Sequence, residues 1–527
     1  MGSRATGGFS GFLATLTHLF SPGKVFIGRA SYHGIGLLQP VGLSVKRHLM
    51  LYAMTGSSKT TSIITMIATW RGAVFLVDPK GQVVFALAEQ DWRTWHVIAP
   101  GEKNSACINF FDVIKEMMKR YGRDAAVRWS LRLAEALIIT AAGAKNPYFT
   151  DVARQFLAAL ILHVLTKHPE QDHNLPFVRD LIINGYLVFD DFKNLISTPE
   201  EAQTLLFRAM LENDAFEIIA GGAQALISAS GETAGNVRSV LQEQTKWLDM
   251  PDARAVLRHS TISLSDLKTR DDTVVALAAS IFSVREGFAA FVRALTNFTA
   301  YTFEAVPERK GLCLAVLDEL PSAGYNAAIE VSLAVLRSMG MVVVAISQSI
   351  ELMRKTYPKS YKSFSGEADA TIWAGGNHQE NVEHLSQLLG RRSIVEKDPY
   401  SGRKHYRDVD VMTPDQLRRF LHPDSGNIIV TRAGDRPLKL KAPYYFKELA
   451  VWQYAADPDH REALLRRFSR LFFRPKRRSA NDRTPAPIQR QERSSDAHFE
   501  MPMAVDNTVF ETPNHEEMTD EEKPQTD

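Results

Sequence analysis

The chain has 527 residues, of which 45% are hydrophobic and 23% charged, a composition typical of a globular protein with two or three domains. Its two cysteines, Cys107 and Cys313, exclude a disulfide framework and a cysteine-based zinc site. We find no apolar run of the roughly 18 residues that a membrane-spanning helix needs, and no signal-peptide pattern, so we expect a cytoplasmic protein.

Charge is distributed unevenly along the chain. From Ser479 onward there are 12 acidic and 4 basic residues, a net charge of −8. Because the whole chain has a net charge of +2, residues 1–478 have a net charge of +10. Residues 479–527 are also rich in Pro, Ser, Thr, Asn and Gln, and we predict a disordered acidic tail that serves as a solubiliser or docks a basic partner. Residues 451–478 form a basic amphipathic segment, which fits either an anionic membrane surface or a helix packed on the domain.

Apolar strands alternate with helical patterns, which predicts an α/β fold with a mostly parallel sheet. The pattern changes from about Ala125 to Met250, where long helical stretches indicate an all-helical insertion. The predicted strands are residues 48–54, 72–78, 94–100, 273–279, 312–319, 341–348, 370–375 and 426–433.

The first predicted strand runs into a phosphate-loop-like stretch, "AMTGSSKT". The pattern G-x-x-x-x-G-K-[ST] has Ala53 and Ser58 at its glycine positions, while Lys59 and Thr60 are present. If position 58 needs a positive φ, a serine there costs about 1–2 kcal/mol, and Ala53 adds a methyl group where the loop turns. We therefore expect a weakened nucleotide site. Its phosphate-binding residues are Thr55, Gly56, Ser57, Ser58, Lys59, Thr60 and Thr61.

Two later strands end in polar residues of the kind that such a site needs. "LCLAVLDE" ends in Asp318 and Glu319, the first suited to hold Mg²⁺ together with the Thr60 hydroxyl, the second to polarise an attacking water. "MVVVAISQ" ends at Gln348, an amide that can sense a γ-phosphate. Because ligands of open α/β sheets collect at the carboxyl edge of the strands, we predict an ATP–Mg²⁺ site there, with Glu319 and Gln348 as the catalytic residues.

The order and wording of these stretches resemble the coupling proteins of type IV secretion systems, the ATPases that bring DNA to a conjugation channel. The matching stretches run from about residue 27 to 445 and include "LSVKRHLMLYAMTGSSKTTS", "AVFLVDPKGQ", "NPYFTDVARQFLAALILHVL" and "VLDELPSAG". The resemblance implies a RecA-like nucleotide-binding domain (27–124 and 256–450) with an inserted all-α domain (125–255), preceded by an N-terminal segment (1–26). It also implies a homo-hexamer whose sites a neighbouring arginine completes, with Arg391 and Arg392 as candidates.

The implied function is recruitment and translocation of single-stranded DNA with its relaxase to the channel. The two missing glycines leave a non-catalytic or weakly ATP-binding cargo receptor as the alternative, and a hexameric translocase of the chromosome-segregation or packaging kind as a second. The ATPase assignment thus depends on a degenerate loop. We find no base-reading motif, so contact with single- or double-stranded DNA is expected to be non-specific and salt-sensitive.

The same resemblance implies that relaxosome proteins and channel components are partners. The family's N-terminal transmembrane helices have no counterpart before the first strand, either naturally or because the sequence begins after them. We therefore expect a protein peripherally associated with the bacterial inner membrane, held there by a partner or by the basic segment.

Overall fold

The computed structural model describes residues 23–32, 35–54, 56–140, 147–188, 195, 197–278, 289–397 and 404–455. The predicted acidic tail, most of the basic segment, nearly all of the N-terminal segment and Thr55 lie outside these ranges. What we expect of them remains a prediction.

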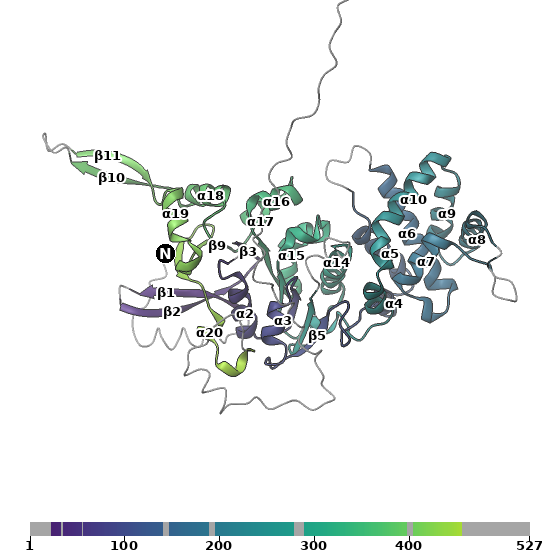
Figure 1. Ribbon diagram of the computed structural model, residues 1–527, viewed down its shortest axis with the longest axis horizontal. Coiled ribbons are helices and arrows are strands. Elements are labelled where there is room, and N and C mark those ends of the chain that lie inside the picture. Colours follow the sequence, from purple (N-terminus) through teal and green to yellow (C-terminus); the bar gives the residue numbers. More distant parts are fainter. Residues whose placement is uncertain are drawn as a thin grey trace, which may run out of the picture. The chain divides into compact units, whose positions relative to one another are not determined.

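One sheet of eleven strands organises the chain, in the order β2-β1-β13-β12-β9-β3-β8-β7-β4-β6-β5 (Figure 1). The seven strands from β9 to β5 pair in parallel, and β12, β13, β1 and β2 extend the sheet by antiparallel pairs. The strands are β1 Lys24–Tyr32, β2 Ile35–Ser44, β3 Leu49–Ala53, β4 Val74–Val77, β5 Thr94–Ile98, β6 Thr273–Leu277, β7 Cys313–Leu317, β8 Met341–Ser347, β9 Ala370–Ala374, β12 Asn427–Thr431 and β13 Leu438–Lys441.

The parallel strands read as nearly continuous apolar runs because helices cover both of their faces. Alternate residues enter two cores: Leu49 and Leu51 of β3 face one, while Met50 and Tyr52 face the other. The first core also holds side chains of α2 (Lys59–Thr69) and α3 (Gln82–Leu87). The second continues without a break into the helices between β5 and β6.

All elements that the structure describes between β5 and β6 are helical, as the change in sequence pattern predicts. The run begins before Ala125, at Phe110, and ends with α12; the domain limits 125–255 remain a prediction. Its members are α4 Phe110–Tyr121, α5 Ala125–Leu137, α6 Tyr148–Lys167, η1 Glu170–Asp172, α7 Leu175–Asn184, α8 Pro199–Leu211, α9 Glu217–Ile227, α10 Gly231–Thr245, η2 Lys246–Asp249, α11 Pro251–Leu257 and α12 Asp266–Thr269.

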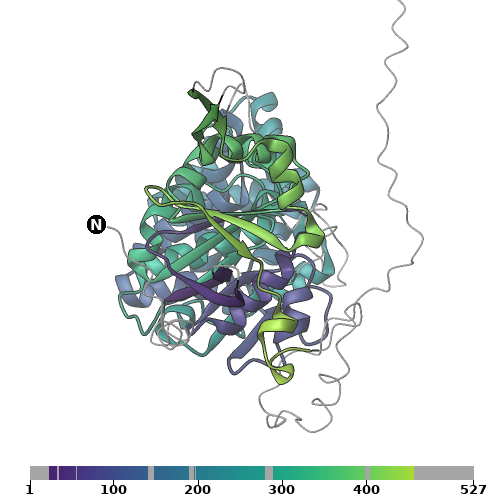
Figure 2. The ribbon, with the colours of Figure 1, turned by 90° about the vertical axis from the view of Figure 1, so that its left-hand side faces the viewer.

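The remaining helices lie between or after the later strands. Figure 2 views the sheet from the side on which β1, β2 and the C-terminal strands lie. These helices are α14 Ala289–Ala305, η4 Leu320–Ala323, α15 Ala327–Met339, α16 Ile350–Thr356, α17 Tyr361–Gly366, α18 Gln379–Leu389, α19 Pro414–Phe420, η5 Pro423–Ser425, α20 Tyr445–Glu448 and η6 Val451–Gln453. A separate two-stranded sheet, β10 Arg391–Lys397 and β11 Lys404–Asp410, stands between α18 and α19.

Helix α6 is the one described helix that is long and apolar enough to cross a membrane, a test of length and composition only. The sequence pattern did not single it out. Two thirds of its most apolar window is buried, and it packs against α5, α9 and α10. Its apolar character is therefore that of a core helix.

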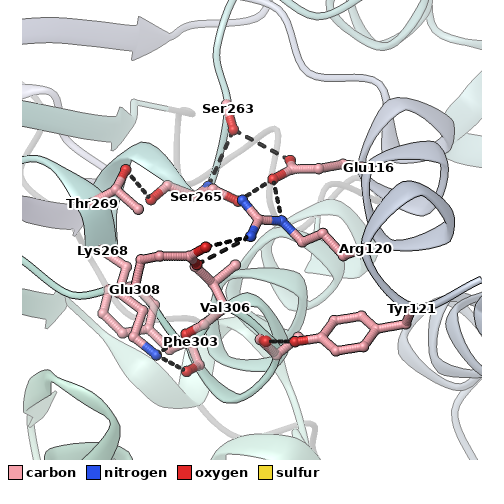
Figure 3. Close-up of polar contacts among 11 residues, drawn as sticks. Glu116, Arg120, Tyr121, Ser263, Ser265, Lys268, Thr269, Phe303, Val306 and Glu308 are labelled. Carbon is pink, nitrogen blue, oxygen red and sulfur yellow. Dashed lines mark hydrogen bonds and ion pairs between the residues drawn. The ribbon is translucent and has the colours of Figure 1, made fainter.

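A polar junction joins α4 and α12 to the C-terminal end of α14 (Figure 3). Arg120 of α4 pairs with Glu116 at 3.4 Å and with Glu308 at 3.1 Å. Lys268 of α12, which is 6% exposed, donates from Nζ to the carbonyl oxygens of Phe303, at 2.6 Å, and of Val306. Because the last carbonyls of a helix have no partners within it, this ammonium both satisfies them and favours the negative end of the helix dipole.

Candidate functional site

The loop between β3 and α2 is described except at Thr55, and two of its residues have left-handed backbones. Ser58 sits at the N-cap of α2 with φ 64° and ψ 19°, a left-handed conformation that the missing glycine would adopt without strain. Its carbonyl oxygen accepts from Ser62 N at 3.0 Å and from Thr61 Oγ1 at 2.7 Å, which begins the helix. Gly56 has φ 82° and open space where a Cβ would stand. The condition on which the expected cost at position 58 depended is thus met.

Ala53 does not lie in the turn of the loop, where its methyl group was expected. It is the last residue of β3, pairs in register with Ala374 of β9 and is fully buried. Its φ is not positive, since Ser58 and Glu319 are the non-glycine residues with positive φ among those described. The interpretation of its methyl group as an obstacle in a tight turn was wrong: the methyl group fills the core beside the sheet.

The end of β9 supports the loop from behind. Met54 N donates to Ala374 O at 3.3 Å, and a Cβ on Gly375 would stand 3.0 Å from the Cβ atoms of Met54 and Ser57. At Gly376 it would stand 2.7 Å from the Cα of Arg418 in α19. Both glycines are therefore needed for close packing. Sequence reasoning missed them, although "AGGN" directly after an apolar strand was a usable signal.

Lys59 and the two acids of β7 meet at the carboxyl edge of the sheet. Lys59 Nζ lies 2.9 Å from Asp318 Oδ1 and 3.2 Å from Glu319 Oε2, and all three residues are less than 10% exposed. Burial lowers the pKa of Lys59, but the carboxylates of Asp318 and Glu319 outweigh it, so its pKa lies above the ordinary value. The ammonium is therefore charged at neutral pH and compensates two buried acids.

Gln348 completes the cluster from the strand between them. Because β8 lies between β3 and β7, the residue after it falls next to both loops. Its Nε2 donates to Glu319 Oε2 at 3.0 Å. Glu319 has φ 61° and ψ 50°, and this left-handed backbone begins the η4 turn. A non-glycine residue held in that region costs about 1–3 kcal/mol and is enriched at functional sites.

The turn after β4 supplies neighbours that sequence reasoning did not assign to the site. Thr60 Oγ1 donates to Gln82 Oε1 at 3.3 Å. Asp78 is 1% exposed and its Oδ2 accepts from Val83 N at 2.8 Å and Val84 N at 3.0 Å, which fixes the start of α3. Burial raises the pKa of Asp78 to about 6, with a further contribution from Asp318. The stretch "VDPKGQ" was the available signal.

The arrangement offers an ammonium and a helix N-terminus on one side and buried carboxylates on the other. The ammonium of Lys59 and the N-terminus of α2 attract phosphate. The carboxylate of Asp318 and the hydroxyl of Thr60 offer the oxygen ligands that Mg²⁺ prefers. The parallel sheet, the loop before α2 and the helical region between β5 and β6 together define the class: a RecA-like P-loop α/β protein with an inserted helical region.

Comparison with known proteins supports this class and narrows it. A family model described as "Type IV secretory system Conjugative DNA transfer" matches residues 22–467. The chain therefore belongs to this family of conjugative DNA-transfer proteins. It is 24% identical over 431 residues to a probable conjugal transfer protein TraG of Sinorhizobium fredii, which covers 78% of this chain and 64% of that protein. It is 23% identical over 423 residues to TraG of Agrobacterium fabrum, covering 76% and 60%.

Solved structures show the same fold. The plasmid coupling protein TrwB in complex with ADP and Mg²⁺ aligns with a TM-score of 0.57 at 17% identity, covering 76% of this chain and 85% of that one. TrwB with a non-hydrolysable ATP analogue aligns equally well at 16% identity, covering 80% and 96%. The chain spans less than two thirds of the length of the two TraG relatives, so their whole activity does not transfer to it by similarity alone.

Proposed function

We propose that this chain is a coupling ATPase that binds ATP–Mg²⁺ at the carboxyl edge of β3, β7 and β8 and uses it to deliver DNA to a conjugative secretion channel. The observation that carries the proposal is a connected set of contacts at the ends of three neighbouring strands. Lys59 contacts Asp318 at 2.9 Å and Glu319 at 3.2 Å, and Gln348 contacts Glu319 at 3.0 Å. Membership of a conjugative DNA-transfer family supports DNA as the cargo and a type IV secretion channel as its destination.

Each residue has a definite role in this proposal. Lys59 turns from the two acids toward the β- and γ-phosphates, while amide groups of the loop and of α2 bind their oxygens. Asp318 and Thr60 would hold Mg²⁺, which would supply positive charge against the charge that develops on the phosphates. Glu319, released by Lys59, accepts a proton from the attacking water, and Gln348 reports the state of the γ-phosphate through its bond to Glu319.

Nucleotide binding separates this proposal from accidental clustering. Lys59→Ala should weaken Mg²⁺-dependent binding of a fluorescent ATP analogue at least ten-fold, because the principal cation for the phosphates is lost. Lys246→Ala is the matched control, since Lys246 pairs only with Glu243 on the surface of α10 among the contacts of the described residues. Unchanged affinity in Lys59→Ala would refute the site.

A second variant tests catalysis without removing the cation. Glu319→Gln keeps the size of the side chain and should retain nucleotide affinity while lowering the hydrolysis rate by about 10²–10⁴. It also covers the case in which Lys59→Ala, by leaving two buried acids unpaired, fails to fold. If the parent protein binds ATP but does not hydrolyse it, the cargo-receptor alternative replaces the motor; the left-handed Ser58 favours that alternative.

The partners follow from the same proposal. We expect non-specific contact with DNA phosphates, interaction with a relaxase and with channel components, a ring of six subunits, and a site of action at the bacterial inner membrane. The +10 charge of residues 1–478 supports the DNA contact.

A further inference from the structure

The β10–β11 hairpin stands apart from the main sheet. Its strands pair from Arg391↔Asp410 to Lys397↔Lys404, and the contact of the two strands with the rest of the described chain is mainly with α18. In Figure 1 it extends away from the eleven-stranded sheet, beyond α18 and α19. A two-stranded hairpin alone is marginally stable in water, so a hairpin retained at this length is best explained by a partner that covers it.

One face of the hairpin carries an exposed apolar pair, one aromatic and one aliphatic residue. Val395 and Tyr406 lie opposite each other in register and are 52% and 75% exposed. Since side chains alternate between faces along a strand, Lys404 lies on the same face as Tyr406, and Arg407 lies on the other. A flat aromatic ring beside a lysine is the combination on which nucleic-acid bases stack while a phosphate is neutralised.

The acids of the two described strands of the hairpin each have a polar partner. Asp410 pairs with Arg391 at 3.3 Å, Glu396 pairs with Arg407 at 3.8 Å, and Asp408 accepts from Ser393 Oγ. Within the described ranges, neither Arg392 nor Lys404 has an ion-pair partner. The charge left over on the described part of the hairpin is therefore positive, which complements a polyanion.

We propose that this hairpin binds single-stranded DNA, with a base stacked on Tyr406 and a neighbouring phosphate at Lys404. The inference rests on the proposed DNA-handling function and assigns part of it to a defined surface. Arg391 has no part in this DNA-binding proposal, because its guanidinium pairs with Asp410 at the base of the hairpin.

The test is fluorescence anisotropy of a labelled 20-nucleotide oligo(dT) with the full chain, at several salt concentrations. Tyr406→Ala should weaken binding by about 5- to 100-fold, the range that loss of one stacked base produces, and Tyr406→Phe should retain it. Lys404→Ala should weaken binding and lower the slope of log affinity against log salt by about one. Arg407→Ala removes the same charge from the opposite face of the same strand and should change binding much less.

The outcomes separate the two proposals. If the parent chain does not bind the oligonucleotide, the DNA-handling function fails. If it binds, and Tyr406→Ala and Lys404→Ala bind as tightly as Arg407→Ala, the hairpin assignment is overturned while the function stands. If Tyr406→Ala instead disperses an oligomer in analytical ultracentrifugation without changing DNA affinity, the hairpin is a contact between subunits and the proposal is also overturned. These side chains are exposed, so the variants should fold, which thermal melting checks.

Discussion

Exchanging the two residues that replace loop glycines should have opposite effects on stability. Ser58 holds φ 64° without a side-chain hydrogen bond to the helix it caps. Ser58→Gly should remove about 1–2 kcal/mol of left-handed strain and add about 0.4–1 kcal/mol of unfolded-state entropy, a net stabilisation of about 0.5–1 kcal/mol. Ala53→Gly should lose about 0.8 kcal/mol of methyl burial and about 0.5–1 kcal/mol of strand entropy, a net destabilisation of about 1.5 kcal/mol.

Gly56→Ala provides the matched control for this reasoning. Its φ is 82° and nothing lies within 4 Å of the added Cβ, so the substitution tests backbone strain without a clash. It should destabilise by about 0.5–1 kcal/mol, because about 1–2 kcal/mol of left-handed strain is partly offset by about 0.4–1 kcal/mol of reduced unfolded-state entropy. Midpoints of urea unfolding, followed by tryptophan fluorescence at one protein concentration, rank the three variants.

We expect the urea midpoint of Ser58→Gly to lie above that of the parent protein. The midpoints of Gly56→Ala and Ala53→Gly should lie below it. A Ser58→Gly protein that unfolds at lower urea than the parent would refute the assignment of strain to this residue. Because the strained φ belongs to the folded loop, its cost enters the free energy of folding. Restoring both glycines together would mix a gain with a loss, so the single variants are needed.

Two further predictions concern the helical region. Lys268→Met should lower the free energy of unfolding by about 1–3 kcal/mol, measured by the same urea series, because the carbonyls of Phe303 and Val306 lose their buried donor; an unchanged midpoint would contradict this role. Burial, followed by His168 and Lys167, lowers the pKa of His163 to about 4, and its Nδ1 faces the amide nitrogen of Asn213 at 3.0 Å. The folded protein therefore favours the neutral imidazole of His163. The resulting stabilisation is complete above pH about 6.5 and is lost as the pH falls toward 4, by at most about 3 kcal/mol. His163→Gln should flatten this part of the curve of unfolding free energy against pH.

The sequence predicted the parallel centre of the sheet well and its edge poorly. Strands β3, β4, β7 and β8 are buried on both faces, so each is an apolar run whose end can be located by its first polar residues. Strand β13, on the antiparallel side of the sheet, is exposed at three of its four positions, and most residues of β11 in the separate hairpin are exposed as well. Strand β13 also pairs with β1 near the start of the chain, and a local apolar pattern does not reveal so distant a partner.

The candidate site shows the same division. Asp318, Glu319 and Gln348 were predicted because they come directly after a strand and carry the chemistry themselves, and Lys59 because it begins the helix that follows β3. The structure brings the four together. Gly375 was missed because its role is to leave room for a loop more than 300 residues earlier. Such a requirement exists only after the strands have been placed side by side.

The charge of the cluster has a consequence for how it binds nucleotide. Lys59, Asp318 and Glu319 sum formally to −1 in a volume from which water is largely excluded. A triphosphate adds negative charge there, and the amides at the start of α2 supply only about half a unit charge in return. One lysine therefore cannot serve the phosphates and both acids at once. Under the proposed function, Mg²⁺ at Asp318 would offset part of this charge. A further positive group could come from Lys80 in the turn after β4, which already acts on the Asp318 carboxylate, or from a neighbouring subunit of the proposed ring.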